Sequence, residues 1–225
     1  MKKLFFTILL ISVLFSCASN AVSRDTSVTH KQDDSPAVID KPELNKKQKP
    51  PEMPEVTEKP GLPLYIMGQG KVDAEKLALF LLQNNSGVDS SYAKSLAGFY
   101  IEEASFEGVN HDIAFVQMCL ETGFLRYGGD VKPEQYNFAG LGATGSGEPG
   151  LSFPEPRIGV RAQIQHLKAY GCTDPLKGES VNPRFRYVRR GAAPTYEGLA
   201  GTWAADRQYG VKISSLLQRL YDFAF

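Results

Sequence analysis

One glutamate of the chain, Glu121, stands where a carboxyl group can be kept protonated. It lies in the last turn of a helix that we predict to begin at Asn110 and to end at Gly123. The C-terminus of a helix carries partial negative charge, which disfavours a second negative charge beside it. Apolar neighbours such as Met118 and Phe124 would remove water from the carboxyl and favour its neutral form. Such an acid can protonate the leaving oxygen of a glycosidic bond, although a glutamate at a helix end is more often a surface residue.

Five segments carry the apolar spacing of helices, and they would position this glutamate. They cover about residues 73–83, 91–105, 110–122, 160–170 and 211–223. Between the third and fourth lies the glycine-rich stretch Ala139–Leu151, which has no helical period and which we interpret as a loop or a short hairpin lobe. We therefore predict one mainly helical domain over residues 63–225, about 160 residues long and large enough for a proper core.

The first 17 residues, MKKLFFTILLISVLFSC, are typical of a bacterial lipoprotein signal peptide. Two lysines precede an apolar run of about a dozen residues, which is too short to cross about 30 Å of hydrocarbon. The run ends in LFSC, which resembles a lipobox, so we expect Cys17 to become the lipid-modified first residue. The alternative is an ordinary signal peptide with a chance cysteine. In either case we expect the protein to leave the cytoplasm.

Residues 18–62 have the composition of a disordered tether. They are rich in Lys, Asp, Glu, Ser, Gln and Pro, and they contain no Phe, Tyr or Trp. Such a segment cannot bury enough apolar surface to offset the entropy lost on ordering. As a flexible coil its ends would lie roughly 35 Å apart on average. A tether of this kind suits an enzyme that works away from a membrane, and it suits a displayed binding domain equally well.

Several other functional classes do not fit the composition. The formal net charge is zero, and removal of the signal peptide makes the chain slightly acidic, which argues against a nucleic-acid partner. Cys119 and Cys172 do not make a disulfide scaffold, and Cys119 lies in a helical apolar pattern where a buried free thiol is expected. His111 and His166 have no cysteine or carboxylate at zinc-ligand spacing, so we predict no metal site. The glycine-rich stretch lacks the lysine of a phosphate loop.

Four segments, in order along the chain, resemble the bacterial glucosaminidase domain of glycoside hydrolase family 73. They are residues 114–125 (AFVQMCLETGFL), 136–145 (YNFAGLGATG), 159–170 (GVRAQIQHLKAY) and 203–213 (WAADRQYGVKI). The resemblance implies a lysozyme-like α+β fold with a small β-hairpin lobe, and it aligns Glu121 with the catalytic acid of the family. It also matches Tyr209 to a family tyrosine that lies close to the scissile bond.

Members of this family often carry a second carboxylate on the small lobe, and two glutamates are candidates here. Glu148 lies in the glycine-rich stretch, where a mobile loop could carry it over the groove that the lysozyme-like fold implies. Glu155 is stiffened by a proline on either side. Spacing does not choose between them, and each could be a solvated surface residue. A second carboxylate is also unnecessary where the N-acetyl group of the substrate acts as the nucleophile.

Aromatic side chains should supply the platform for the sugars, since a pyranose ring offers an apolar face. Tyr136 and Phe138 precede the glycine-rich stretch, so we expect them along the groove, with Asn137 bonding a sugar amide. Trp203 falls where many family members have tyrosine. For each of these aromatic residues the alternative is packing in the core.

The resemblance thus implies an endo-β-N-acetylglucosaminidase that hydrolyses β-1,4 bonds of peptidoglycan glycan strands without a cofactor. We expect a monomer, anchored by its lipid to a bacterial membrane and facing the periplasm or the cell surface. A lytic transglycosylase would use the same acid but close its product with an internal hydroxyl. A non-catalytic wall-binding lipoprotein would only hold the glycan, and cleavage of host N-linked glycans would use the same chitobiose chemistry.

Overall fold

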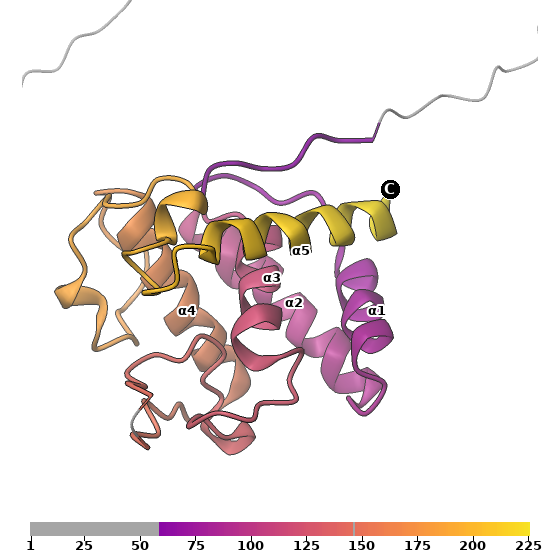
Figure 1. Cartoon of the computed structure of the whole chain (residues 1–225), viewed down its shortest axis with the longest axis horizontal. Coiled ribbons are helices and arrows are strands. Elements are labelled where there is room, and N and C mark those ends of the chain that lie inside the picture. Colours follow the sequence, from indigo (N-terminus) through magenta and orange to yellow (C-terminus); the bar gives the residue numbers. More distant parts are fainter. Residues whose placement is uncertain (1–58, 146) are drawn as a thin grey trace, which may run out of the picture. The chain divides into compact units, whose positions relative to one another are not determined.

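The computed structural model describes residues 59–145 and 147–225 of the chain (Figure 1). The predicted signal peptide, Cys17 and most of the predicted tether lie outside these residues. The described part is mainly helical, with α1 (Ala74–Asn84), α2 (Ser90–Glu107), α3 (His111–Thr122), α4 (Pro156–Gly171) and α5 (Tyr209–Ala224). Short 3-10 helices are η1 (Pro133–Gln135), η2 (Phe185–Tyr187) and η3 (Glu197–Leu199). Among the described helices, none has the length and apolarity required to span a membrane.

The five predicted helices are confirmed, and their ends follow from local chemistry. The side chain of Asp73 accepts a hydrogen bond from the backbone N–H of Lys76 and so caps α1, and Asp89 caps α2 in the same way. The fourth helix begins at Pro156 rather than near Val160, because proline is well suited to the first turn of a helix.

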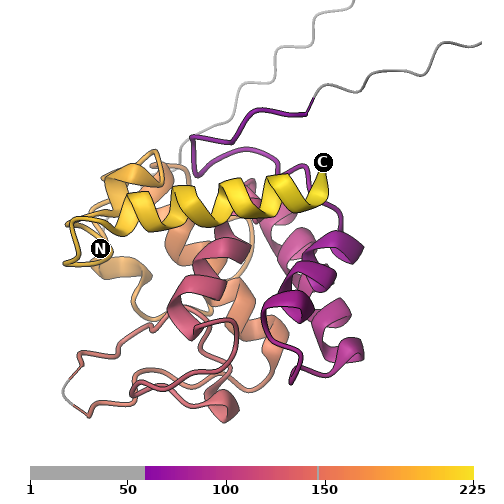
Figure 2. The ribbon, with the colours of Figure 1, turned by 45° about the vertical axis from the view of Figure 1, so that its right-hand side comes forward.

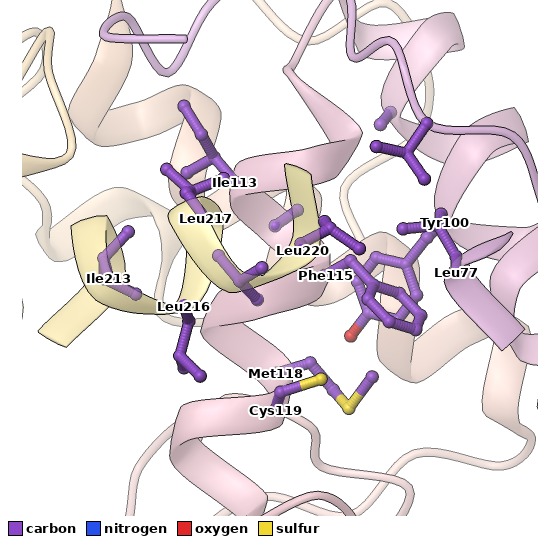
Figure 3. Close-up of a cluster of buried hydrophobic side chains, with 14 of the residues drawn as sticks. Leu77, Tyr100, Ile113, Phe115, Met118, Cys119, Ile213, Leu216, Leu217 and Leu220 are labelled. Atoms are coloured by element: carbon purple, nitrogen blue, oxygen red, sulfur yellow. The ribbon is translucent and has the colours of Figure 1, made fainter. Parts of the chain in front are cut away.

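Helix α3 is the central element of the core. All but two of its residues are buried, and it packs against α2, α4 and α5. Figure 3 shows its apolar side chains facing those of α5, with Leu77 of α1 and Tyr100 of α2 completing the cluster. Figures 1 and 2 both show α5 crossing α3, while the segment that joins α3 to α4 lies beyond the C-terminal end of α3. The C-terminal end of α3 is therefore held in place by the packing of the helix against α2, α4 and α5.

The other end of α3 is anchored by buried polar groups. The side chain of Asn110 accepts hydrogen bonds from the N–H groups of Asp112 (3.0 Å) and Ile113 (3.2 Å), and this cap accounts for the predicted start of the helix at Asn110. The Asp112 carboxylate is fully buried and accepts from the Tyr221 hydroxyl (2.8 Å) and the Lys71 N–H (2.7 Å). A carboxylate at this end also interacts favourably with the helix dipole. These contacts tie α3 to α5 and to the segment before α1.

The glycine-rich stretch forms a folded loop and not a pair of strands. In residues 59–145 and 147–225 there is no β-strand, and the stretch contributes one isolated antiparallel bridge, Ala143 with Pro149. The predicted β-hairpin lobe is thus reduced to a single bridge. The side chain of Asn137 supplies hydrogen bonds that paired strands would otherwise make. Its amide N–H groups donate to the carbonyls of Leu141 (2.9 Å) and Leu151 (3.0 Å), and its oxygen accepts from the Leu141 N–H (2.9 Å).

Helices α2 and α4 are joined by ion pairs, one of which is buried on both sides. Lys168 lies 2.8 Å from Glu107, and their side chains are only 3% and 1% exposed. Glu103 accepts hydrogen bonds from Arg157 (3.1 Å) and Arg161 (2.7 Å). Buried charges need such partners, because an unpaired charge removed from water is costly. The pairs fix α4, which carries Gln163, His166 and Tyr170, three side chains of the candidate site described below.

Candidate active site

Glu121 lies in the last turn of α3, as the sequence predicts. The helix ends at Gly123, whose left-handed backbone (φ 58°) directs its N–H to the carbonyls of Cys119 and Leu120. Thr122 bonds back to the carbonyl of Met118 through its hydroxyl (2.7 Å). The termination is therefore sharp, and it leaves the Glu121 side chain on the open side of the helix end, where the residue is exposed.

Two neutral donors contact the same oxygen of the Glu121 carboxyl. The Tyr209 hydroxyl donates to Oε1, and the Trp203 indole Nε1–H donates to Oε1 at 3.1 Å. Within the described part of the chain, Oε2 has no hydrogen-bond partner. It faces Gly140, where an added Cβ would lie 3.9 Å away. The two oxygens are therefore unequal: Oε1 is the acceptor, and Oε2 is free to carry a proton toward the glycine-rich stretch.

The surroundings of this carboxyl favour its neutral form. Although Glu121 as a whole residue is exposed, the carboxyl lies against Trp203 and Tyr209, and this loss of water raises the pKa of Glu121. The hydrogen bonds from Tyr209 and Trp203 act in the opposite direction and lower that pKa, but they are the smaller effect. The net result is a carboxylic acid that holds its proton to higher pH than an ordinary glutamate.

A chain of buried hydrogen bonds runs from the core to Glu121. The Tyr100 hydroxyl donates to Gln163 (2.6 Å), the Gln163 amide donates to Gln117 (2.9 Å), and the Gln117 amide donates to the Tyr209 hydroxyl (3.0 Å). Tyr209 in turn donates to Glu121. Every donor points the same way, so the chain ends on Oε1 and orients the Tyr209 hydroxyl as a donor.

Tyr209 stays a neutral phenol over the physiological pH range. Its side chain is buried at the start of α5, and this burial, followed by the nearby charge of Glu121, raises the pKa of Tyr209 far above its usual value. The phenol therefore acts here as a hydrogen-bond donor and not as a base.

Trp203 is held against Glu121 by an aromatic cluster. Its ring lies 5.0 Å from the ring of His166 and 5.6 Å from that of Tyr170, and the Tyr170 hydroxyl donates to the carbonyl of Thr202 (3.1 Å). His166 is fixed by a 2.8 Å contact between its Nδ1 and the Asn182 amide. Burial, reinforced by Arg184, lowers the pKa of His166 to about 4, so the imidazole is neutral at pH 7.

Of the three residues 136–138, which precede the glycine-rich stretch, two are buried. Phe138 is fully buried and packs edge-on to Tyr100, and Asn137 spends its amide on the backbone bonds of the loop. The expectation that Phe138 stacks on a sugar and that Asn137 bonds a sugar amide is therefore corrected. Phe138 packs in the core, and Asn137 stabilises the backbone of the loop. Tyr136 is half-buried and lines a separate cavity.

Neither lobe glutamate is brought to Glu121 by a direct contact. Glu148 is exposed in the loop, and Glu155 is exposed at the start of α4, close enough to Arg161 to raise the pKa of that guanidinium after the larger effect of Glu103. Over residues 59–145 and 147–225, no cluster of three or more His, Cys, Asp and Glu side chains is placed to hold a metal ion. Cys119 and Cys172 are free thiols, and Cys119 is buried as expected.

Sequence reasoning missed Gln117 and Gln163. Gln117 lies four residues before Glu121, a spacing that puts both side chains on one face of α3. That spacing was a usable signal, because a fully buried glutamine on an apolar helix must find hydrogen-bond partners. Gln163 could not be found in this way, since its partners come from two other helices.

Comparisons with known proteins identify the family of the chain. The family model described as Glucosaminidase, mannosyl-glycoprotein endo-beta-N-acetylglucosaminidase, matches residues 97–222, a range that includes Glu121, Trp203 and Tyr209. An uncharacterized protein of Borreliella burgdorferi is 42% identical over 159 residues, which cover 71% of this chain and 78% of that relative. No solved structure matches the chain. The chain therefore belongs to the glucosaminidase family.

Proposed function

We propose that this protein is an endo-β-N-acetylglucosaminidase that cleaves β-1,4 bonds of peptidoglycan glycan strands, with Glu121 as the proton donor. The observation that carries the proposal is the asymmetry of the Glu121 carboxyl, with two donors on Oε1 and none within the described residues on Oε2. Family membership supports the reaction class, and the raised pKa of Glu121 supports its role as an acid.

In this mechanism the proton leaves from Oε2. It passes to the glycosidic oxygen as the bond from that oxygen to the anomeric carbon breaks, and the bonding electrons stay with the leaving oxygen. The sugar ring becomes oxocarbenium-like, and Glu121 becomes a carboxylate. The Tyr209 and Trp203 donors are already aimed at Oε1, so they stabilise this developing negative charge without rearrangement.

A second group must then stabilise the anomeric carbon and allow water to attack it. We propose the N-acetyl group of the substrate for this role, because the two candidate glutamates, Glu148 and Glu155, are both exposed. A glutamate of the loop, Glu148 or Glu155, is the alternative orienter of the water. An acid at the end of a central helix, facing a loop lobe, also supports a lysozyme-like relationship of the two parts.

The sequence supports a proposal for where this reaction takes place. We propose that Cys17 carries the lipid anchor, that residues 18–62 form the tether, and that residues 63–225 form the catalytic domain, acting as a monomer in the cell envelope. The anchor is tested by growing cells with a labelled fatty acid and measuring its incorporation into the wild-type protein and into Cys17→Ser. Globomycin should block the processing of the wild-type protein. Unchanged labelling of the variant would refute it.

The proposed activity is tested by the release of new reducing ends from purified peptidoglycan. Wild-type protein should release them, and Glu121→Gln should not, since an amide cannot donate the proton. Glu75→Gln is the matched control, because it removes an exposed carboxylate in the first turn of α1 and should keep most of the activity. Full activity of Glu121→Gln would exclude Glu121 as the acid.

A further inference from the structure

A concave site lies beside the C-terminal end of α3. It has a volume of about 430 Å³ and lies between the loop that joins α1 to α2 and the segment that follows α3. Its walls include Tyr92, Tyr127 and Tyr136, with Leu125 between them and with Asp89 and Glu134 at the polar side. The volume is that of a site for one small ligand or one unit of a polymer.

The backbone at this site adopts conformations that side chains other than glycine rarely take. Leu125 (φ 61°), Tyr127 (φ 57°) and Tyr136 (φ 48°) are all left-handed, and all three line the cavity. Such residues cluster at functional sites, where the surrounding structure holds them in place. Here the Tyr127 N–H bonds the carbonyl of Thr122 (2.7 Å), and the Asn85 amide bonds that of Phe124 (2.7 Å).

The chemistry of the walls suits a neutral ligand that carries hydroxyl groups. The lining contains two carboxylate residues and no lysine or arginine, which disfavours an anion. Burial raises the pKa of Tyr92 to about 12, with a smaller contribution from Tyr136. Burial, followed by the proximity of Tyr92 and Glu134, raises the pKa of Tyr127 as well. The hydroxyls therefore remain neutral, and the half-buried rings leave part of their faces open for contact with a sugar.

Tyr136 connects this cavity to the acid. Its side chain also packs against the small buried cluster of Ala139, Leu141, Phe153 and Ala162, on which Trp203 packs as well. Four residues after Tyr136, Gly140 faces Oε2 of Glu121. A polymer that places one bond at Glu121 can therefore run past the glycine-rich stretch and place another unit beside Tyr136.

We propose that this tyrosine cavity binds a second sugar of the same glycan strand, remote from the bond that Glu121 cleaves. The inference rests on the proposed function, because it takes the strand at Glu121 as its starting point. It makes the enzyme selective for strand length: a strand long enough to reach both sites binds more tightly than a disaccharide.

The test uses full-length protein in mild detergent, with Glu121→Gln to prevent cleavage. Affinities are measured for N-acetylchitohexaose and for N-acetylchitobiose, before and after the further change Tyr127→Asn. Asparagine removes the ring but tolerates the left-handed backbone, so the loop is retained. Tyr136→Asn is a second variant of the same design. Tyr65→Asn is the control, since this exposed tyrosine lies in the segment before α1.

The expected result is that Tyr127→Asn and Tyr136→Asn weaken hexaose binding by a factor on the order of 3–10, as the loss of one aromatic contact implies. Chitobiose binding and the Tyr65→Asn control should be unchanged. Equal loss for both sugars, or no loss for the hexaose, would overturn the inference. So would a loss confined to isolated stem peptides, which would assign the cavity to the peptide.

Failure of the proposed function is read from a different measurement. If wild-type protein cuts no glycan but the hexaose affinity still depends on Tyr127, the cavity stands and the hydrolase activity falls. If wild-type protein cuts peptidoglycan and Tyr127→Asn leaves the hexaose affinity unchanged, the proposed activity is retained and the proposed role of the cavity is refuted. Thermal melting of each variant excludes unfolding as the cause of a lost affinity.

Discussion

The Tyr209 hydroxyl donates a hydrogen bond to Oε1 of Glu121 across a separation of 88 residues. This contact joins the first residue of α5 to the last turn of α3, so the acid is complete only when the C-terminal helix has packed onto the core. Because burial keeps Tyr209 neutral, the contact is a stable donor bond in both protonation states of Glu121.

Tyr209→Phe should keep the fold and slow glycan cleavage by about a hundredfold, since it removes one pre-aimed donor to the developing carboxylate. The Tyr209 bond lowers the pKa of Glu121, so its loss should raise that pKa further. The alkaline limb of the profile of kcat against pH should therefore move to higher pH. A slower enzyme with an unmoved limb would mean that Tyr209 acts on the substrate alone.

Gln117 acts as a positioning residue for Tyr209. Gln117→Leu removes one of the two acceptors of the Gln163 amide, which keeps its bond to the Ala114 carbonyl, and it removes the donor to the Tyr209 hydroxyl. The change should cost about 1–3 kcal/mol of unfolding free energy. It should also slow cleavage, because the Tyr209 hydroxyl can then rotate away from Glu121. Loss of that hydrogen bond should move the alkaline limb of the profile of kcat against pH to higher pH.

The matched control for that change is Gln165→Leu. Gln165 is equally buried but bonds the carbonyl of Glu179 (2.8 Å) and the N–H of Val181 (2.9 Å), away from the acid. It should lower stability to a similar degree without moving the pH profile. If both variants shift the profile alike, the effect of Gln117 is merely structural.

The raised pKa of Glu121 makes its contribution to stability depend on pH. The folded protein holds this proton more tightly than the unfolded chain, so the neutral acid stabilises the fold below the unfolded pKa, and this contribution is lost as pH rises through the folded pKa. Glu121→Gln has no proton to lose there. Its melting temperature relative to wild type should therefore increase as the pH rises from the unfolded pKa, about 4, through the raised folded pKa. A constant difference would contradict the raised pKa.

The buried pair of Lys168 and Glu107 should dominate the stability of the contact between α2 and α4. Lys168→Met leaves the buried Glu107 carboxylate with the backbone N–H groups of Lys177 and Gly178 but without a cation, and it should cost about 3–5 kcal/mol in urea unfolding. Adding Glu107→Leu should recover part of that loss. For comparison, Glu102→Ala removes an exposed partner of Arg157 and should cost less than about 1 kcal/mol. A double variant less stable than Lys168→Met would contradict this account.

The helices could be predicted because their signals are local. Asn110 and Gly123 mark the two ends of α3 by cap chemistry alone, and Glu121 follows from them. Phe138 was misassigned because its direction depends on distant contacts: the left-handed backbone at Tyr136 and the core ring of Tyr100 turn it inward. No local pattern carries that information.

The tyrosine cavity was hidden for the same reason. Tyr92 fits the apolar stripe of α2, and nothing near it in sequence indicates that it shares a wall with Tyr127 and Tyr136. The hydrogen-bond chain to Glu121 likewise draws on α2, α3, α4 and α5, so only Gln117 carried a sequence signal.

The most direct test of the central claim is mass spectrometry of the chain ends released from purified peptidoglycan. Wild-type protein should produce fragments ending in reducing N-acetylglucosamine, and Glu121→Gln should produce none. Anhydro-muropeptides would keep Glu121 as the acid but make the enzyme a lytic transglycosylase. Retained glycan binding with no fragments from the wild-type protein would contradict the account, because the protein would then only hold the glycan.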